Sequence, residues 1–188
     1  MSYLNQTLTI TDNKIYYTDT DIDQTYEIMM DWEDEIMSAS AAYICQNGGD
    51  ILEVGFGMGI SAGYIQSHSI NSHTICENHP QIIPLALEWA KNKPNVTIIT
   101  SSWYDVKDTL GTFDGIFYDT FGDDNWKEFG STLTSLCNRG ALATWFNCSP
   151  SSSNLSVYPS SSHEAYSVNP EPNFYFNHKT YYLPKWQL

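Results

Sequence analysis

Three alternating glycines and an acid that follows them predict a nucleotide-binding site. Gly55, Gly57 and Gly59 come directly after the short apolar run 51–54 and before a predicted helix. Glycine tolerates positive φ and lets a ligand approach the backbone, while the first N–H groups of a helix are unpaired donors. Glu77 ends the next predicted strand, where an acid can accept hydrogen bonds from ribose hydroxyls. The pattern favours a Rossmann-like site; the simpler interpretation is a tight turn without a ligand.

A second acid, Asp119, ends another predicted strand, 115–119. Ligands of open α/β sheets bind at the carboxyl ends of the strands, so an acid in this position is well placed for chemistry. The alternative is that Asp119 only caps the helix that follows.

Alternating strand and helix patterns must position these residues. We predict strands at 51–54, 74–77, 96–100, 115–119 and 142–146, with helices at 59–67, 81–92, 106–110 and 126–137. Two further strands, 165–168 and 174–183, have no long helix between them and fit an antiparallel edge. We therefore expect an α/β fold, a mostly parallel seven-stranded sheet with helices on both faces.

The residues before the first parallel strand predict a hairpin and a helix. Alternating apolar side chains over 7–18 indicate the hairpin, which belongs to an N-terminal extension at 1–24. Between 25 and 45 apolar residues recur every four positions from Ile28, as in an amphipathic helix.

A serine-rich stretch at 149–163 interrupts the second half of the chain. We expect an exposed and mobile loop there, because the stretch has few apolar residues to pack. We see no repeat and no second domain, so residues 1–188 are predicted to form a single domain.

Composition and charge argue against several classes of partner. The net charge is −14, with only 8 lysines and arginines, which argues against nucleic acids and anionic membranes as partners. The four cysteines have no CxxC spacing and do not cluster with the five histidines, so we expect no metal site. No apolar run reaches the roughly 18 residues of a membrane helix, and no signal peptide is recognisable. We expect a cytoplasmic protein, as a monomer or homodimer.

Four blocks of sequence are more specific than these patterns. They are MMDWEDEIM at 29–37, LEVGFGMGI at 52–60, ICE at 75–77 and FDGIFYDTF at 113–121. In order and spacing they resemble guanidinoacetate N-methyltransferase and the related protein arginine N-methyltransferase that modifies the internal (δ) guanidino nitrogen. The resemblance implies a class I methyltransferase fold with S-adenosylmethionine as methyl donor, S-adenosylhomocysteine as product, and a guanidino group as acceptor.

The resemblance also implies which residues act on the acceptor. Glu33 and Asp119 would be the catalytic carboxylates that bind the guanidinium, and Cys148 and Ser149 would also contact the substrate. A guanidinium is planar and protonated, so paired carboxylates can hold it bidentately and accept its proton as the new N–C bond forms. The simpler interpretation of Glu33, which we place four residues after Met29 on one helical stripe, is a solvated helix acid.

A larger group of residues would hold the methyl donor, according to the same resemblance. They are Met29, Met37, Gly55, Phe56, Gly57, Met58, Gly59, Ile60, Glu77, Asn78, His79, Ser102, Trp103 and Asp119. Trp103 could equally be an aromatic residue of the core.

Two elements of the family are not recognisable in this sequence: the long helix between the fifth and sixth strands, and the N-terminal lid with its aromatic residue. Both help to enclose the substrate, so guanidinoacetate, free arginine and protein arginine all stay open as acceptors. Two alternatives remain, a methyltransferase of the same fold with another small substrate and a non-catalytic S-adenosylmethionine-binding protein.

Overall fold

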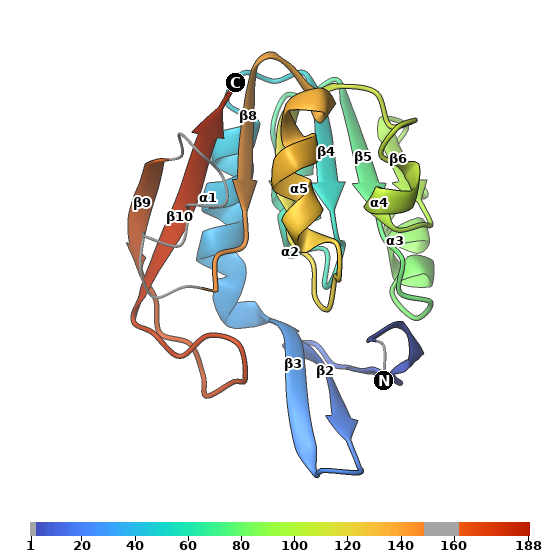
Figure 1. Ribbon diagram of the computed structural model, residues 1–188, viewed down its shortest axis with the longest axis vertical. Coiled ribbons are helices and arrows are strands. Elements are labelled where there is room, and N and C mark those ends of the chain that lie inside the picture. The colour runs from blue at the N-terminus through green and yellow to red at the C-terminus, as the bar shows by residue number, and fades with distance from the viewer. Residues whose placement is uncertain (1–2, 149–161) are drawn as a thin grey trace.

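The computed structural model of the chain describes residues 3–148 and 162–188. Figure 1 shows one large sheet with helices on both faces and a separate small sheet beyond one end of its strands. Most of the predicted serine-rich loop, residues 149–161, lies outside the described residues, and residues 162 and 163 belong to a strand.

The large sheet has seven strands, five of them parallel. In spatial order they are β6 (Val96–Ile99), β5 (Ser72–Cys76), β4 (Asp50–Val54), β7 (Phe113–Tyr118), β8 (Cys137–Trp145), β10 (Thr180–Gln187) and β9 (Ser162–Ser167). The strands from β6 to β8 are parallel, and β10 pairs antiparallel with both β8 and β9. The predicted fold class, including its antiparallel edge, is confirmed.

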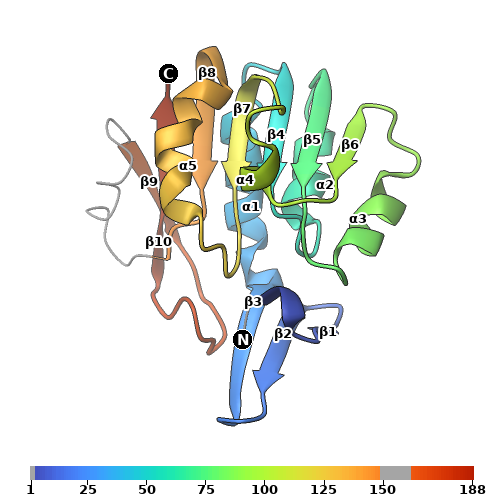
Figure 2. The ribbon, with the colours of Figure 1, turned by 45° about the vertical axis from the view of Figure 1, so that its right-hand side comes forward.

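Five α-helices accompany this sheet: α1 (Asp34–Ile44), α2 (Ile60–Ser67), α3 (Ile83–Ala90), α4 (Trp103–Val106) and α5 (Trp126–Thr132). In Figures 1 and 2, α1 and α2 lie behind the sheet and α4 and α5 lie in front of it. Successive residues of β4 explain this arrangement, because Ile51 packs in the cluster around α1 and Leu52 in the cluster that holds Phe129 of α5. A strand that is apolar on both faces must be covered on both.

The segment 24–33 corrects the predicted helix 25–45. Residues Gln24–Met30 form strand β3, a 3-10 turn follows at Asp31–Glu33, and only Asp34 begins α1. Strand β3 pairs antiparallel with β2 (Lys14–Asp19), and β2 pairs with β1 (Thr9–Ile10), the two strands of the predicted hairpin. Pairing with β2 overrides the helical spacing of a segment that also contains strand-forming residues such as Tyr26. Met29 and Glu33 therefore do not share a helical stripe.

Three smaller boundaries also differ from the prediction. The helix expected at 106–110 is wrong except for its first residue, because α4 covers Trp103–Val106, and the helix expected at 126–137 ends at Thr132 before a 3-10 turn. Strand β8 begins at Cys137 instead of residue 142.

Residues 174–179, predicted to begin a strand, form a loop that precedes β10. Asn173 shapes this loop, because its Oδ1 accepts hydrogen bonds from the backbone N–H groups of Tyr175, at 3.0 Å, and Phe176, at 2.7 Å. Asparagine side chains compete in this way with regular secondary structure.

The small sheet β1–β3 lies at one end of the large sheet. Figure 2 shows it, together with the N-terminal 3-10 turn Tyr3–Asn5, beyond the carboxyl ends of the parallel strands. Those ends are where α/β proteins bind their ligands.

None of the helices in the described part of the chain is long and apolar enough to cross a membrane.

Candidate functional site

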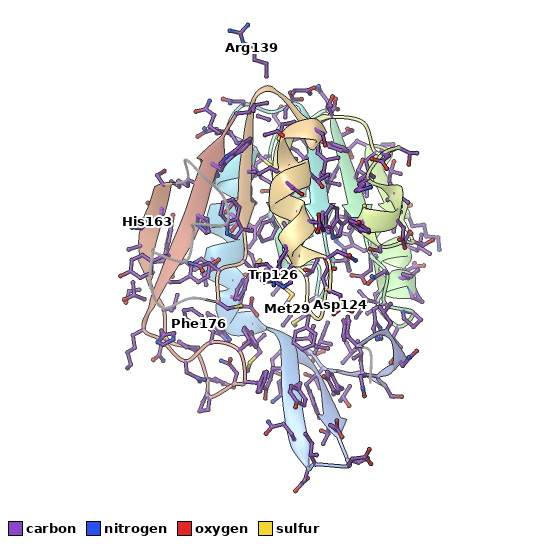
Figure 3. All side chains as sticks on the ribbon, viewed as in Figure 1. Met29, Asp124, Trp126, Arg139, His163 and Phe176 are labelled. Carbon is purple, nitrogen blue, oxygen red and sulfur yellow. The ribbon has the colours of Figure 1, made fainter. Side chains whose placement is uncertain are left out.

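A cavity of about 270 Å³ opens at the carboxyl ends of β4, β5 and β7. Nine of the residues predicted to bind the cofactor line it: Met29, Gly55, Phe56, Gly57, Glu77, Asn78, Ser102, Trp103 and Asp119. Met29 and Asp124, far apart in the chain, both line the cavity, and Figure 3 labels them at the same end of the molecule. The structure thus gathers most of the predicted set around one space.

Five predicted cofactor residues, Met37, Met58, Gly59, Ile60 and His79, do not line this cavity. Met37 is fully buried in the core beneath α1. Met58, Gly59 and Ile60 form the turn into α2, behind the residues that face the cavity. His79 is also fully buried, and its ring lies 4.7 Å from that of Tyr3. Two of these five residues contact the wall, because the N–H of Met58 donates to Sδ of Met29 and the N–H of His79 donates to Oε1 of Glu77.

The glycine loop requires glycine for two different reasons. A β-carbon on Gly55, which has φ of +94°, would lie 1.9 Å from the carbonyl oxygen of Asp119. A β-carbon on Gly57 would lie 2.6 Å from the Sδ atom of Met29, which also accepts a hydrogen bond from the N–H of Met58 at 3.2 Å. The loop is therefore pressed between the end of β7 and strand β3, with its backbone exposed to the cavity.

Glu77 lines the cavity, and its carboxylate also binds backbone N–H groups of two neighbouring loops. Its Oε2 accepts a hydrogen bond from the N–H of Phe56 at 2.9 Å, and its Oε1 accepts from the N–H groups of Asn78 and His79 at 2.8 and 2.7 Å. Only 7% of the Glu77 surface is exposed. A carboxylate has about four lone-pair sites, so capacity for ribose hydroxyls remains.

Trp103 fits both of the interpretations that the sequence left open. It is 2% exposed, packs edge-on against Tyr118 and Phe129, and also lines the cavity. Its Nε1–H donates to Oδ2 of Asp123 at 2.7 Å, and the Tyr118 hydroxyl donates to the same oxygen at 2.5 Å. Asp123, which sequence reasoning missed, therefore fixes the loop after β7 to this wall.

Tyr3 is a second residue of the cavity wall that the sequence did not indicate. Its ring lies 5.1 Å from that of Phe121, besides its contact with His79. No sequence motif lies near Tyr3, so the sequence alone did not indicate that it lines the cavity. An aromatic side chain from the N-terminal turn thus covers part of the cavity.

The two predicted catalytic carboxylates, Glu33 and Asp119, are close enough for their charges to interact. Glu33 is 2% exposed, and its Oε1 accepts hydrogen bonds from the N–H of Met30 at 2.8 Å and the hydroxyl of Tyr175 at 2.5 Å. Burial, followed by the charge of Asp119, raises the pKa of Glu33 above its usual range. Burial and the charge of Glu53 likewise raise the pKa of Asp119. Glu33 is therefore not a solvated helix acid.

Cys148, expected at the substrate, lies within electrostatic reach of both carboxylates. Desolvation, followed by the charges of Asp119 and Glu33, raises the pKa of its thiol to about 11. Ser149, the other expected substrate contact, lies outside the described residues.

The site as a whole is suited to cations. Five acids line the cavity, namely Glu77, Asp105, Asp119, Asp123 and Asp124. All eight lysines and arginines lie in the described part of the chain, and none of them lines the cavity. Figure 3 shows Arg139 at the opposite end of the molecule. Acids without basic partners favour a positively charged occupant.

Comparisons with known proteins agree with this geometry. A model of the family described as guanidinoacetate N-methyltransferase matches residues 8–138. Protein arginine N-methyltransferase 2 of Yarrowia lipolytica is 38% identical over 161 residues, which cover 78% of this chain and 33% of the relative. The protein of the same name from Eremothecium gossypii is 41% identical over 132 residues, covering 64% of this chain and 32% of the relative. The chain spans about a third of the length of these curated relatives.

A solved structure supports the fold independently. The N-methyltransferase NodS from Bradyrhizobium japonicum, in complex with S-adenosyl-L-homocysteine, superimposes with a TM-score of 0.63 at 12% sequence identity. The match covers 84% of this chain and 87% of that chain. At this identity the likeness shows a common Rossmann-like methyltransferase fold.

Proposed function

This chain belongs to the guanidinoacetate N-methyltransferase family, and we propose that it uses S-adenosylmethionine to methylate a nitrogen of a guanidino group. The observation that carries the proposal is a pair of buried carboxylates. Asp119 lines the cavity where β7 ends, and Glu33, which does not itself line the cavity, is 2% exposed, is held at Oε1 by the Tyr175 hydroxyl and lies close enough for the charge of Asp119 to raise its pKa. The acceptor would be a small guanidino compound or an arginine of a protein, as the names of the relatives suggest.

The cavity supports S-adenosylmethionine as the methyl donor. Gly55 and Gly57, where β-carbons would meet Asp119 and Met29, let the loop present its backbone to the cavity, and Glu77 would offer its remaining lone-pair site to a ribose hydroxyl. Ser102 and Trp103 would border the adenine, while Asp119 lies at the end where the methyl group would be presented. The acidic lining also suits the positive sulfonium.

The two carboxylates explain how the acceptor would be held and deprotonated. Glu33 and Asp119 would bind the guanidinium N–H groups by charge-assisted hydrogen bonds. Because both pKa values are raised in the free protein, a bound cation would favour loss of the carboxyl protons. When bound, S-adenosylmethionine would supply the methyl group: the nitrogen lone pair would form the N–C bond, and the S–C bond would break with its electrons left on sulfur. The nitrogen then loses one proton to Asp119 or Glu33.

A methylation assay with a panel of acceptors tests the proposal. The chain is incubated with methyl-labelled S-adenosylmethionine and, separately, guanidinoacetate, free arginine, an arginine-containing peptide and the same peptide with lysine in place of arginine. We expect label in at least one guanidino acceptor and none in the lysine peptide. Transfer to a non-guanidino acceptor alone favours a methyltransferase with another substrate, and cofactor binding without any transfer favours a non-catalytic protein.

A further inference from the structure

The loop between β9 and β10 reaches across the sheet to the N-terminal part of the chain. Besides its two bonds at Oδ1, Asn173 donates from Nδ2 to the carbonyl oxygens of Glu171 and Phe176, both at 2.8 Å. Figure 3 shows Phe176 toward the same end of the sheet as Met29. Asn177 adds a bond from its Nδ2 to the carbonyl oxygen of Asn173 at 2.8 Å, so hydrogen bonds of two asparagine side chains shape the loop.

Contacts with β3 and the 3-10 turn fix the position of this loop. The N–H of Phe174 donates to Oε2 of the buried Glu27 at 3.0 Å, and the Phe174 ring lies 4.6 Å from that of Tyr26. The Tyr175 ring lies 6.1 Å from Trp32 and 5.9 Å from Phe146. The contacts with Glu27, Tyr26 and Trp32 join residues more than a hundred positions apart, and the Tyr175 hydroxyl donates to Glu33.

The two carboxylate oxygens of Glu33 differ in their hydrogen bonds. Both Tyr175 and the N–H of Met30 donate to Oε1, and no described residue donates to Oε2. A carboxylate held at one oxygen keeps a fixed orientation and presents the other to a ligand. The Tyr175 bond also favours the ionised form of Glu33, against the effects of burial and of Asp119.

We propose that Tyr175 is a positioning residue for methyl transfer: its hydroxyl holds Oε1 of Glu33 and so orients the carboxylate, with Oε2 free for the guanidinium. This inference rests on the proposed function. The helix that encloses the substrate in the family was not recognisable in the sequence. In this chain the loop that carries Tyr175 packs beside Glu33 instead. No motif in the sequence pointed to Tyr175.

Several other titratable groups interact electrostatically with Glu33 or with its neighbour Asp119. They are Asp119 after β7, Cys148 after β8 and Tyr181 on β10, and Glu53 acts on Asp119 in turn. None of these groups donates a hydrogen bond to Glu33; among the side chains of the described residues, only that of Tyr175 does. Removing its hydroxyl changes one contact of Glu33 and leaves the other charges in place.

The test compares Tyr175→Phe with Tyr64→Phe. Phenylalanine keeps the ring that packs on Trp32, so the loop should stay folded. Tyr64→Phe is matched, because it removes a tyrosine–carboxylate hydrogen bond of 2.8 Å to Asp34, the residue next to Glu33. The pKa of Glu33 is measured by NMR in protein labelled with ¹³C at the glutamate carboxyls, and Glu33→Gln identifies its signal. The pH dependence of methylation is then recorded for the best guanidino acceptor.

We expect Glu33 in Tyr175→Phe to need a pH about one unit higher to ionise, since a hydrogen bond to the charged form is lost. The acidic limb of the methylation profile should move by the same amount, an approximately tenfold loss of activity on that limb. Tyr64→Phe should change neither. An unchanged or lower pKa of Glu33 overturns the proposal, and so does a raised pKa with an unmoved limb. Failure of the proposed function looks different: the wild-type chain then methylates no guanidino acceptor at any pH.

Discussion

The backbone at Gly55 lies so close to Asp119 that a β-carbon on the glycine would be 1.9 Å from the aspartate carbonyl oxygen. The N–H of Asp119 also donates to the carbonyl oxygen of Val54 at 2.9 Å. The glycine loop and the acid after β7 are therefore one rigid unit. A change in the loop must move the residue that we assign to catalysis.

Gly55→Ala should destabilise the protein by roughly 2–4 kcal/mol, because the methyl group meets backbone and φ is +94°. Chemical denaturation measures the loss. Gly63→Ala is the control: the position is inside α2, with no atom within 4 Å of the added carbon. It should stabilise the protein by about 0.5–1 kcal/mol. Equal stability of both variants would contradict the packing described here.

Asp119→Asn should reduce methyl transfer by about a hundredfold or more, while cofactor affinity stays nearly unchanged. Asparagine keeps the shape, but it loses the charge and turns N–H donors toward the guanidinium, which has only donors. Single-turnover methylation and calorimetry measure the two effects. Asp108→Asn, at an exposed acid paired with Lys107, is the control.

The same experiment with Glu33→Gln tests whether the acids act together. The losses from Glu33→Gln and Asp119→Asn should not add in the double variant if both carboxylates grip one guanidinium. Turnover of Asp119→Asn near the wild-type rate would remove the guanidino-methyltransferase assignment and leave a cofactor-binding fold.

Glu77→Ala should weaken S-adenosylmethionine binding by roughly 1–3 kcal/mol, about tenfold to a hundredfold in Kd. The loss combines the ribose contact with release of the three backbone N–H groups that Glu77 now holds. Titration calorimetry on protein with an unchanged circular dichroism spectrum measures it. Glu88→Ala, at an exposed acid of α3, should bind normally. Unchanged affinity in folded Glu77→Ala would exclude Glu77 from the site.

Glu33→Gln should stabilise the free protein, and more so as the pH rises. Burial, followed by the charge of Asp119, raises the folded pKa of Glu33, so the folded state holds its proton where the unfolded state has lost it. Wild-type stability therefore falls as the pH rises from the ordinary glutamate pKa to the raised one. Glutamine keeps the Oε1 acceptor and removes this loss, a gain of roughly 1–3 kcal/mol above that range.

Urea denaturation at several pH values measures this gain. Glu35→Gln, at an exposed position of α1, serves as the control and should show little dependence on pH. A gain for Glu33→Gln that is the same at low and high pH would show that ionisation of Glu33 is not its cause.

Local patterns were sufficient for the parallel sheet and for the part of the site built on it. The apolar run of β4 with its glycines, Glu77 after β5 and Asp119 after β7 are each set by a few neighbouring residues. Parallel strands bring their carboxyl ends to one edge, so these residues had to meet once the elements were recognised.

Only the tertiary structure decided the acceptor side of the site. Residues 24–30 have spacings that suit a helix or a strand, and pairing with β2 selects the strand. That choice places Glu33 in a 3-10 turn, where Tyr175, 142 positions later in the chain, reaches its carboxylate. The sequence determined which acids are present and where the cofactor loop lies. Packing between distant segments decided which acids are buried, which charges interact and which hydroxyl holds Glu33, because burial and hydrogen bonding depend on contacts that no local spacing encodes.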